Sequence, residues 1–205
     1  MPDMKKLTRA EQKARRPAQI LDAAFEEFVE RGYVATRVED IADRVGITKG
    51  TIYVYFETKE QLFEAMIRHI SVPFEDLLAS AHELSGTCSE RLEGLIAMLY
   101  DRIVENRRLR ELMRFVIAEG SRFPQVVDRH HEEFIDPLNA HLQSLIDEGV
   151  NQGEFRPAPA AFADAVVAPV IAMLIFKLIF NDRRALDKTT YLEAHLDLIL
   201  HGLMA

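Results

Sequence analysis

Five neighbouring residues carry side chains that could contact a nucleic acid: Lys49, Thr51, Tyr53, Val54 and Tyr55. They fall on the surface of one short predicted helix. A helix that only filled a core would have no need for two tyrosines and a valine there. A helix laid against DNA would use them, because hydroxyl and ammonium groups position a protein on the backbone and an apolar side chain can touch a thymine methyl group. These residues therefore indicate a DNA-contacting helix.

Two short helices and the turn between them must position that surface, within residues 36–62. Thr36 and Glu39 match a T-x-x-E capping box, which satisfies free amides at a helix start. Gly46 falls where a left-handed residue would end this helix, and Thr48 can cap the next one. Two helices joined by a turn of three or four residues that contains glycine are typical of a helix-turn-helix.

The motifs of this region resemble those of a known family. Phe28 to Tyr33 read F-x-x-x-G-Y, and the segment that starts at Thr36 reads T-x-x-x-D-I-A-x-x-x-G-I-T-K-G-T-I-Y-x-Y-F-x-x-K-E-x-L. Over roughly residues 17–70 this pattern resembles the DNA-binding domain of the TetR/AcrR family of transcriptional regulators. The rest of the chain is similar to the family in size and helical pattern.

The resemblance implies a role for each matching residue. Those that would face the major groove or its rim are Lys49, Gly50, Thr51, Tyr53 and Val54. Those that would bond phosphates are Thr36, Thr48, Tyr53, Tyr55 and Lys59. Many members of the family carry a polar residue at the position of Val54, so the base contact is where this chain departs from them. For Tyr53 and Tyr55 the alternative is packing under the neighbouring helix.

Composition and charge suit a DNA-binding head with a separate acidic body. The chain has 205 residues, of which 48% are hydrophobic and 28% charged, and its net charge is −8. Residues 1–69 hold 12 basic and 12 acidic residues, so the negative charge belongs to residues 70–205 and can lie away from DNA. The single cysteine, Cys88, excludes an intrachain disulfide. The first twenty residues are polar and basic, unlike a signal peptide, which predicts a cytoplasmic protein.

Three regions are expected along the chain. Residues 1–16, with six basic and two acidic residues, would form a basic arm that adds phosphate contacts; a solubilising tail is the alternative. Residues 17–70 would form the helix-turn-helix domain, and residues 72–205 the effector-binding and dimerisation domain. We predict an all-α fold with an N-terminal three-helix head, a larger C-terminal helical bundle and about nine to ten helices.

Helix boundaries follow from periodicity, glycines and prolines. The first helix would start at Pro17 or Ala18 and stop at Gly32, and the fourth would end before Pro73. Body helices are expected over residues 73–84, 89–106, 108–119, 124–152, 159–181 and 189–203. Pro137 predicts a kink in the longest of them.

Residues 165–180 are apolar on nearly every side of a helix. A membrane span needs about 20 apolar residues, whereas Asp164 and Lys177 bracket only twelve uncharged ones, so we predict no membrane segment. One face of such a helix would pack in its own body and the other against a partner chain. With the amphipathic last helix it would form a twofold homodimer, as the resemblance implies, and place two recognition helices about 34–36 Å apart on palindromic double-stranded operator DNA. The expected interface residues are Val167, Val170, Leu174, Leu178, Leu192, His195, Leu196 and Ile199.

The resemblance also implies a ligand-controlled switch, in which a small molecule favours a shape of the body whose heads no longer fit the operator. Mostly apolar walls suit a lipophilic or aromatic effector, and repression is the family default. The candidate cavity residues are Leu99, Tyr100, Ile103, Phe115, Glu119, Phe134, Leu138, Phe162 and Val166. For each of them the alternative is ordinary core packing.

Catalytic and metal-binding patterns are absent from the sequence. His130 and His131 are adjacent and would point about 100° apart on a helix, and neither a G-x-S-x-G motif nor a phosphate-binding glycine loop occurs. We therefore expect no enzyme, no cofactor and no metal site. Two alternatives to a ligand-controlled regulator stay open: a helical ligand-binding protein with a vestigial DNA-binding head, and a regulator controlled by a protein partner.

Overall fold

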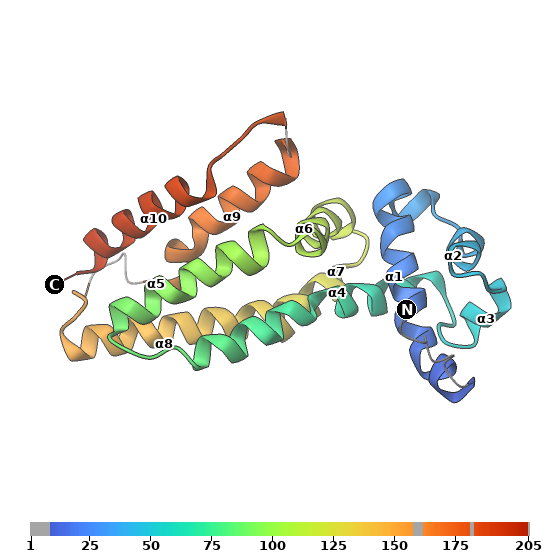
Figure 1. The fold of residues 1–205 in the computed structure, drawn as a ribbon, viewed down its shortest axis with the longest axis horizontal. Coiled ribbons are helices and arrows are strands. Elements are labelled where there is room, and N and C mark those ends of the chain that lie inside the picture. Colours follow the sequence, from blue (N-terminus) through green and yellow to red (C-terminus); the bar gives the residue numbers. More distant parts are fainter. Residues whose placement is uncertain (1–8, 158–161, 181–182, 205) are drawn as a thin grey trace, which may run out of the picture. The chain divides into compact units, whose positions relative to one another are not determined.

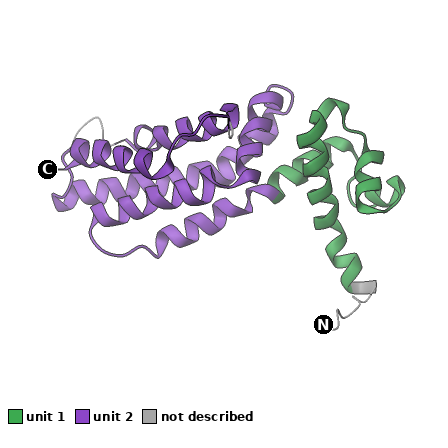
Figure 2. Ribbon diagram, turned by 45° about the horizontal axis from the view of Figure 1, so that its top comes forward, with its two compact units in different colours: residues 1–69 green, residues 70–205 purple. Residues whose placement is uncertain are grey.

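The structure is a computed structural model that describes residues 9–157, 162–180 and 183–204 (Figure 1). These residues form ten α-helices and two π-helical turns, so the predicted all-α class is confirmed. In the same residues one isolated bridge, between Phe155 and Met204, is the only β pairing. The chain divides into two compact units, Met1–His69 and Ile70–Ala205, drawn in green and purple in Figure 2.

The first unit contains α1 (Arg9–Ala35), α2 (Val38–Val45), α3 (Lys49–Tyr53) and the beginning of α4 (Lys59–His82). Each helix contributes an apolar stripe to one shared core. The largest buried side chains of this core are Ile20, Phe25, Phe28, Ile41, Ile52, Leu62, Phe63 and Met66. Burial of this set, at about 1.5–3 kcal/mol for each large side chain, holds the short α3 in place.

α1 differs from its predicted extent. It includes residues from Arg9 onward, so residues 9–16 of the predicted arm are helical, and residues 1–8 lie outside the described part. The residues between Arg9 and Pro17 are Ala, Glu, Gln, Lys and Arg, all strong helix formers, and Pro17 therefore lies inside the helix and not at its start. At the other end Gly32 has φ 75° and ψ 165°, so the helical backbone breaks at the residue predicted as its stop.

α4 also runs further than predicted. It continues through Pro73 to His82, which makes the helix expected over residues 73–84 the second half of α4. Ile70, Phe74 and Leu77 lie on one face across the proline, and all three are buried. Their burial outweighs the hydrogen bond that Pro73 cannot donate.

The second unit holds the remainder of α4 and the body. Its further elements are α5 (Cys88–Leu99), the π turn η1 (Tyr100–Val104), α6 (Arg107–Glu119), α7 (Pro124–His130), the π turn η2 (His131–Ile135), α8 (Asp136–Gln152), α9 (Ala163–Phe180) and α10 (Lys188–Leu203). The two π turns interrupt the helices expected over residues 89–106 and 124–152, and the second directly precedes the expected kink at Pro137. α9 packs against α5, α6, α8 and η1, and α10 packs against α5. Residues 159–161 and 181, where the ends of α9 were expected, lie outside the described residues.

The turn after α8 is fixed by close packing. Gly153 ends the helix in the left-handed region, with φ 78°. The ring of Phe155 then lies against Gly149, where an added Cβ would come within 2.2 Å of the ring. The amide of Arg156 donates to the carbonyl of Leu203 at 2.7 Å, which ties this turn to the end of α10.

Candidate DNA-binding surface and ligand cavity

The turn between α2 and α3 is built as the sequence predicts. Gly46 adopts φ 74°, a left-handed conformation that costs glycine least. Its amide donates to the carbonyl of Asp43 at 3.1 Å, and the amide of Ile47 donates to Ala42 at 3.0 Å. These bonds satisfy carbonyls at the end of α2 and fix the direction in which the chain enters α3.

Thr48 caps α3, also as predicted. Its hydroxyl oxygen accepts from the amide of Thr51 at 3.3 Å, and Ile52 anchors the helix in the core. The opposite side faces solvent: Val54 is 77% exposed and Tyr53 is 40% exposed. Tyr55 is half-buried. The short helix therefore presents an apolar and an aromatic side chain that the rest of the unit does not cover.

Gly50 occupies a position that the unit's own packing leaves open. A Cβ added there would lie 3.8 Å from its nearest neighbour, Oγ1 of Thr48, and the residue has no left-handed φ. Neither space nor backbone conformation within the unit therefore requires glycine. The absence of a side chain at this exposed helix start would leave room for the close approach of an outside partner.

Lys49 is held at this surface by an acidic neighbour. Its Nζ donates to Oε1 of Glu39 at 2.6 Å and lies 5.5 Å from the centre of the Tyr53 ring. The hydrogen bond with Glu39 raises the pKa of Lys49, and the same bond lowers the pKa of Glu39. Both side chains are exposed. Lys49 would therefore have to break its contact with Glu39 to bind a phosphate.

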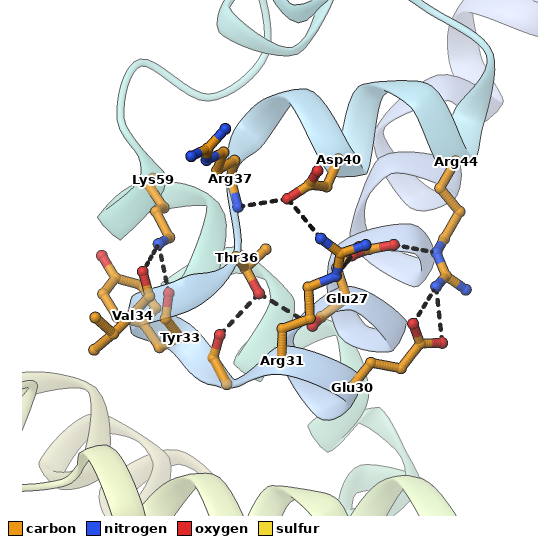
Figure 3. Close-up of polar contacts among 11 residues, drawn as sticks. Glu27, Glu30, Arg31, Tyr33, Val34, Thr36, Arg37, Asp40, Arg44 and Lys59 are labelled. Atoms are coloured by element: carbon orange, nitrogen blue, oxygen red, sulfur yellow. Dashed lines mark hydrogen bonds and ion pairs between the residues drawn. The ribbon is translucent and has the colours of Figure 1, made fainter.

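A cluster of ion pairs around one buried carboxylate joins α1 to α2 (Figure 3). Glu27 is 4% exposed, and its carboxylate meets Nε of Arg44 at 2.7 Å and Nε of Arg31 at 3.1 Å. Arg44 also bonds Glu30 at 2.8 Å, and Arg31 bonds Asp40 at 3.2 Å. None of these ion pairs was predicted from the sequence. The available signal was Glu27 itself, a charged residue three positions after buried Ala24 and beside buried Phe28 on α1.

Thr36 does not serve the roles predicted for it. It is 2% exposed, and its hydroxyl donates to the carbonyls of Gly32 at 2.8 Å and Glu27 at 3.0 Å. The N-cap of α2 is Arg37, whose amide donates to Asp40 at 3.1 Å, so the predicted capping box is wrong. A buried hydroxyl bound to two carbonyls is also not available to a phosphate.

Lys59 is likewise engaged inside the unit. Its Nζ donates to the carbonyl of Tyr33 and lies 4.4 Å from the centre of that residue's ring. The hydroxyl of Tyr33 donates to Glu60 at 2.9 Å. An ammonium group on the last carbonyls of α1 stabilises that helix end. The predicted phosphate contact would therefore compete with an internal capping contact.

The second unit contains an apolar cavity of about 240 Å³. Side chains from α4 to α9 surround it, including both π turns. Its lining residues are Phe74, Leu99, Ile103, Leu109, Leu112, Met113, Val116, Val127, His130, His131, Ile135, Leu138, Asn139, Val167, Val170, Ile171 and Leu174. Only three of these residues are polar.

α9 leaves one apolar face uncovered in the single chain. The exposed residues recur at helical spacing: Ala165, Ala168, Ala172, Ile175 and Ile179. α9 is also long and apolar enough to cross a membrane by length and composition, and 28% of it is buried. Length and composition are weak evidence, because a helix packed against a partner chain has the same character.

Two family models match this chain. Residues 20–66 match the model for bacterial regulatory proteins of the tetR family. Residues 83–198, more than half of the chain, match the model for the Tetracyclin repressor-like C-terminal domain. The chain belongs to the TetR family of transcriptional regulators. α2, the turn and α3 thus form the DNA-binding helix-turn-helix of a TetR regulator. The protein is a transcriptional regulator and not an enzyme.

Relatives in the TetR family agree with this membership. The transcriptional repressor KstR2 of Mycolicibacterium smegmatis is 29% identical over 153 residues, which are 71% of this chain and 70% of the relative. The fatty acid metabolism regulator protein of Bacillus subtilis is 24% identical over 194 residues, 93% of this chain and 98% of the relative. The solved structure of FadR from Bacillus subtilis in complex with stearoyl-CoA has a TM-score of 0.70 at 21% identity and covers 90% of this chain and 98% of its own. At that identity the likeness supports the fold.

The cavity of this TetR regulator includes only part of the predicted set. Leu99, Ile103 and Leu138 line it. The other predicted residues do not, because they are core, surface or hydrogen-bonding groups elsewhere: Tyr100, Phe115, Phe134 and Val166 are buried outside the cavity, Phe162 is exposed, and Glu119 pairs with Arg122. Composition alone could not separate these groups, since core and cavity walls are equally apolar.

The predicted dimer residues also divide. Val170, Leu174 and His195 are buried within their own chain, so they cannot form an interface, and Val167 lines the cavity. Leu178, Leu192, Leu196 and Ile199 are half-buried and stay predicted interface residues. The error is one of helical phase: on a helix that is apolar all round, the sequence does not tell the inner face from the outer one.

Proposed function

We propose that this TetR-family protein is a cytoplasmic, homodimeric repressor that binds palindromic operator DNA and is released by a small lipophilic ligand. The observation that carries the DNA-binding part is the uncovered side of α3. Val54 and Tyr53 are solvent-facing on a helix fixed by Ile52 and the Thr48 cap. An exposed valine there suits contact with a thymine methyl group.

Support for repression and for a lipophilic effector comes from relatives and from the cavity. KstR2 is named as a repressor, and the FadR structure contains stearoyl-CoA. The cavity of this chain is almost wholly apolar, which suits a ligand that leaves water for hydrophobic reasons. A ligand releases DNA only if it binds the DNA-free shape more tightly than the DNA-bound one.

Support for a homodimer comes from the exposed stripe on α9. Ile179 is 54% exposed and Ile175 lies one helical turn away on the same side. Contiguous apolar surface of this kind typically marks an interaction site, and in a twofold dimer one stripe would pack against its copy. A dimer also supplies the two recognition helices that a palindrome requires.

The test of DNA binding is fluorescence anisotropy with the intergenic DNA next to the gene. We expect salt-sensitive binding to one palindromic site, with weaker binding to unrelated DNA. A chain that binds no DNA specifically at low salt would contradict the proposal and favour a ligand-binding protein with a vestigial head.

The test of the dimer is sedimentation of Ile179→Glu beside Ile117→Glu. Both positions are exposed isoleucines, but Ile117 lies on α6 and outside the stripe. Burying a carboxylate against its own copy costs several kcal/mol, so we expect Ile179→Glu to be monomeric and Ile117→Glu to stay dimeric. Dimers for both variants would remove the α9 stripe as the interface.

A further inference from the structure

We propose that the cavity takes a small, uncharged ligand about the size of one substituted ring, whose single polar group bonds Nε2 of His130. This inference rests on the effector role proposed above for the same cavity. It adds the size of the ligand, its charge and the residue that recognises it.

The cavity volume limits the ligand's size. At about 240 Å³ it exceeds the roughly 150 Å³ of an apolar cavity that accepts benzene. It stays below the roughly 300–1,000 Å³ typical of sites for drug-sized ligands. A single ring with a short alkyl group suits this interval, whereas a long acyl chain joined to a nucleotide does not.

The lining of the cavity selects against charge. Fourteen of the seventeen lining residues are apolar, and none is Lys, Arg, Asp or Glu. A carboxylate that entered would lose its water without gaining a counter-charge, which is strongly unfavourable. The ligand must therefore be neutral, with at most a few hydrogen-bonding groups.

Three polar residues line the cavity, and each already has one contact within the protein. Nδ1 of His131 pairs with Asp136 at 3.0 Å, and both side chains are exposed. Nδ2 of Asn139 donates to Asp164 at 3.1 Å. The contacts of His131 and Asn139 are exposed to solvent, whereas that of His130 with Ser71 is part-buried, so we assign the ligand's hydrogen bond to His130.

His130 is fixed in orientation and has one nitrogen available. Its Nδ1 lies 3.2 Å from Oγ of the fully buried Ser71. The centre of its ring lies 5.5 Å from that of the Phe74 ring and 5.4 Å from that of the Phe134 ring. Among the residues that the structure describes, no hydrogen-bond partner meets its Nε2. Burial, and then the neighbouring His131, lowers the pKa of His130 to about 4, so the ring is neutral at pH 7 and offers a hydrogen bond without a charge.

Both π turns form part of the cavity wall. Ile103 of η1 and Ile135 of η2 line the cavity, and His130 directly precedes η2. π turns are rare and frequently occur at functional sites. The bond from His130 to Ser71 also connects the cavity to α4, the helix whose first residues belong to the DNA-binding unit. A ligand on Nε2 would therefore act on a ring that already contacts α4.

Three matched probes test the inference on the full-length protein: 4-isopropylphenol, 4-isopropyltoluene and 4-isopropylbenzoate. They share one ring and alkyl group and differ in a hydroxyl, a methyl and a carboxylate. By calorimetry we expect the phenol to bind about fivefold more tightly than the hydrocarbon, the value of one net hydrogen bond. We expect no binding of the benzoate.

The variant His130→Phe should remove the preference for the phenol, because it keeps a ring of similar size and lacks nitrogen. His141→Phe makes the same substitution on α8 outside the cavity and should keep the preference. If His130→Phe does not fold, the ¹⁵N resonance of Nε2 in the native protein supplies the readout, since a hydrogen bond from the phenol must shift it while the hydrocarbon does not.

The possible outcomes separate this inference from the proposed function. Equal binding of the phenol and the hydrocarbon to the native protein, or binding of the benzoate, would overturn the role of His130. Release of DNA by stearoyl-CoA while all three probes fail to bind would overturn this inference and leave the repressor function intact. Selective binding of the phenol without any effect on DNA would support the inference and contradict the effector role.

Discussion

Thr36→Val tests whether a threonine of the DNA-binding motif contacts DNA or only holds the fold. Valine has nearly the shape of threonine and lacks the hydroxyl. In this chain the hydroxyl donates to the carbonyls of Gly32 and Glu27 at 2.8 and 3.0 Å, and the residue is 2% exposed. We therefore expect a loss of stability without a loss of DNA affinity.

The size of the effect follows from the partners. Gly32 keeps a second donor, the amide of Thr36 at 3.3 Å, so the variant loses one neutral hydrogen bond, worth about 1 kcal/mol. With a urea m-value of about 1–3 kcal/mol/M, the unfolding midpoint should fall by about 0.3–1 M. A lost hydrogen bond to a charged phosphate would instead cost about 1.5–3 kcal/mol of binding, or roughly 10- to 100-fold in affinity.

Thr48→Val is the matched control. The Thr48 hydroxyl is exposed and caps α3, so its loss should cost about 1 kcal/mol of stability and also weaken DNA binding. Urea unfolding and anisotropy at one salt concentration give both quantities for both variants. If Thr36→Val loses as much affinity as Thr48→Val while its unfolding midpoint stays unchanged, the buried role of Thr36 is refuted.

Other substitutions separate base reading, capping and protonation. Val54→Ala should change the preferred operator and Tyr53→Ala should weaken binding to all sequences; an operator selection that returns one unchanged consensus for Val54→Ala would contradict the base contact. Lys59→Ala should lower stability by about 1 kcal/mol, because it removes a cap from α1, and should leave the salt slope of DNA binding unchanged; a slope reduced by about 1 would show a phosphate contact instead. The pKa of His130 is lowered to about 4 in the folded protein, against 6.5 in the unfolded chain. As the pH falls, the unfolded chain therefore takes up this proton first, and the stability of the folded protein decreases between about pH 6.5 and about pH 4. The loss should be at most about 3 kcal/mol, and the stability–pH curves of the native protein and His130→Phe should converge in acid; parallel curves would contradict the shift.

Local chemistry is why the helix-turn-helix could be predicted from the sequence. The end of α2 depends on one glycine in the left-handed region, and the start of α3 depends on one threonine cap. Both signals involve residues within a few positions of one another. These signals do not depend on contacts with distant parts of the chain, so they can be recognised in the sequence alone.

Distant contacts explain the parts that could not be predicted. α4 passes through Pro73 because Ile70, Phe74 and Leu77 find partners elsewhere in the fold. Arg44 lies 17 residues from Glu27, and no pattern in the sequence indicates that the two residues form an ion pair. Thr36 was mistaken for a cap for a different, local reason: its hydroxyl bonds back to the carbonyls of Gly32 and Glu27 in the preceding α1 and not forward to an amide of α2.

α9 shows a different limit. Its residues are apolar on every side, so the spacing of apolar residues does not show which face points into the body. The buried Val170 and Leu174 are of the same type as the exposed Ile175 and Ile179. Only the packing of α9 against α5, α6 and α8 distinguishes the faces. The sequence predicted that α9 has two apolar faces but assigned residues of the inner one to the partner chain.

Two histidines of the body, buried His195 and half-buried His130, differ in how many of their ring nitrogens have a hydrogen-bond partner. Nε2 of His195 donates to the carbonyl of Val166 at 2.9 Å, and its Nδ1 accepts from the hydroxyl of Tyr100 at 3.0 Å. Both nitrogens are therefore used, and the ring ties α10 to α9 and η1 with no capacity for a ligand. His130 is also kept neutral by burial, but the structure gives a partner to its Nδ1 alone. A neutral imidazole with one nitrogen engaged can add one hydrogen bond to an incoming molecule, and the mostly apolar walls of the cavity offer that molecule few other polar groups. The two histidines should therefore respond differently to the same substitution. His195→Phe should lower the stability of the protein and leave its preference for the phenol intact, whereas His130→Phe should remove that preference.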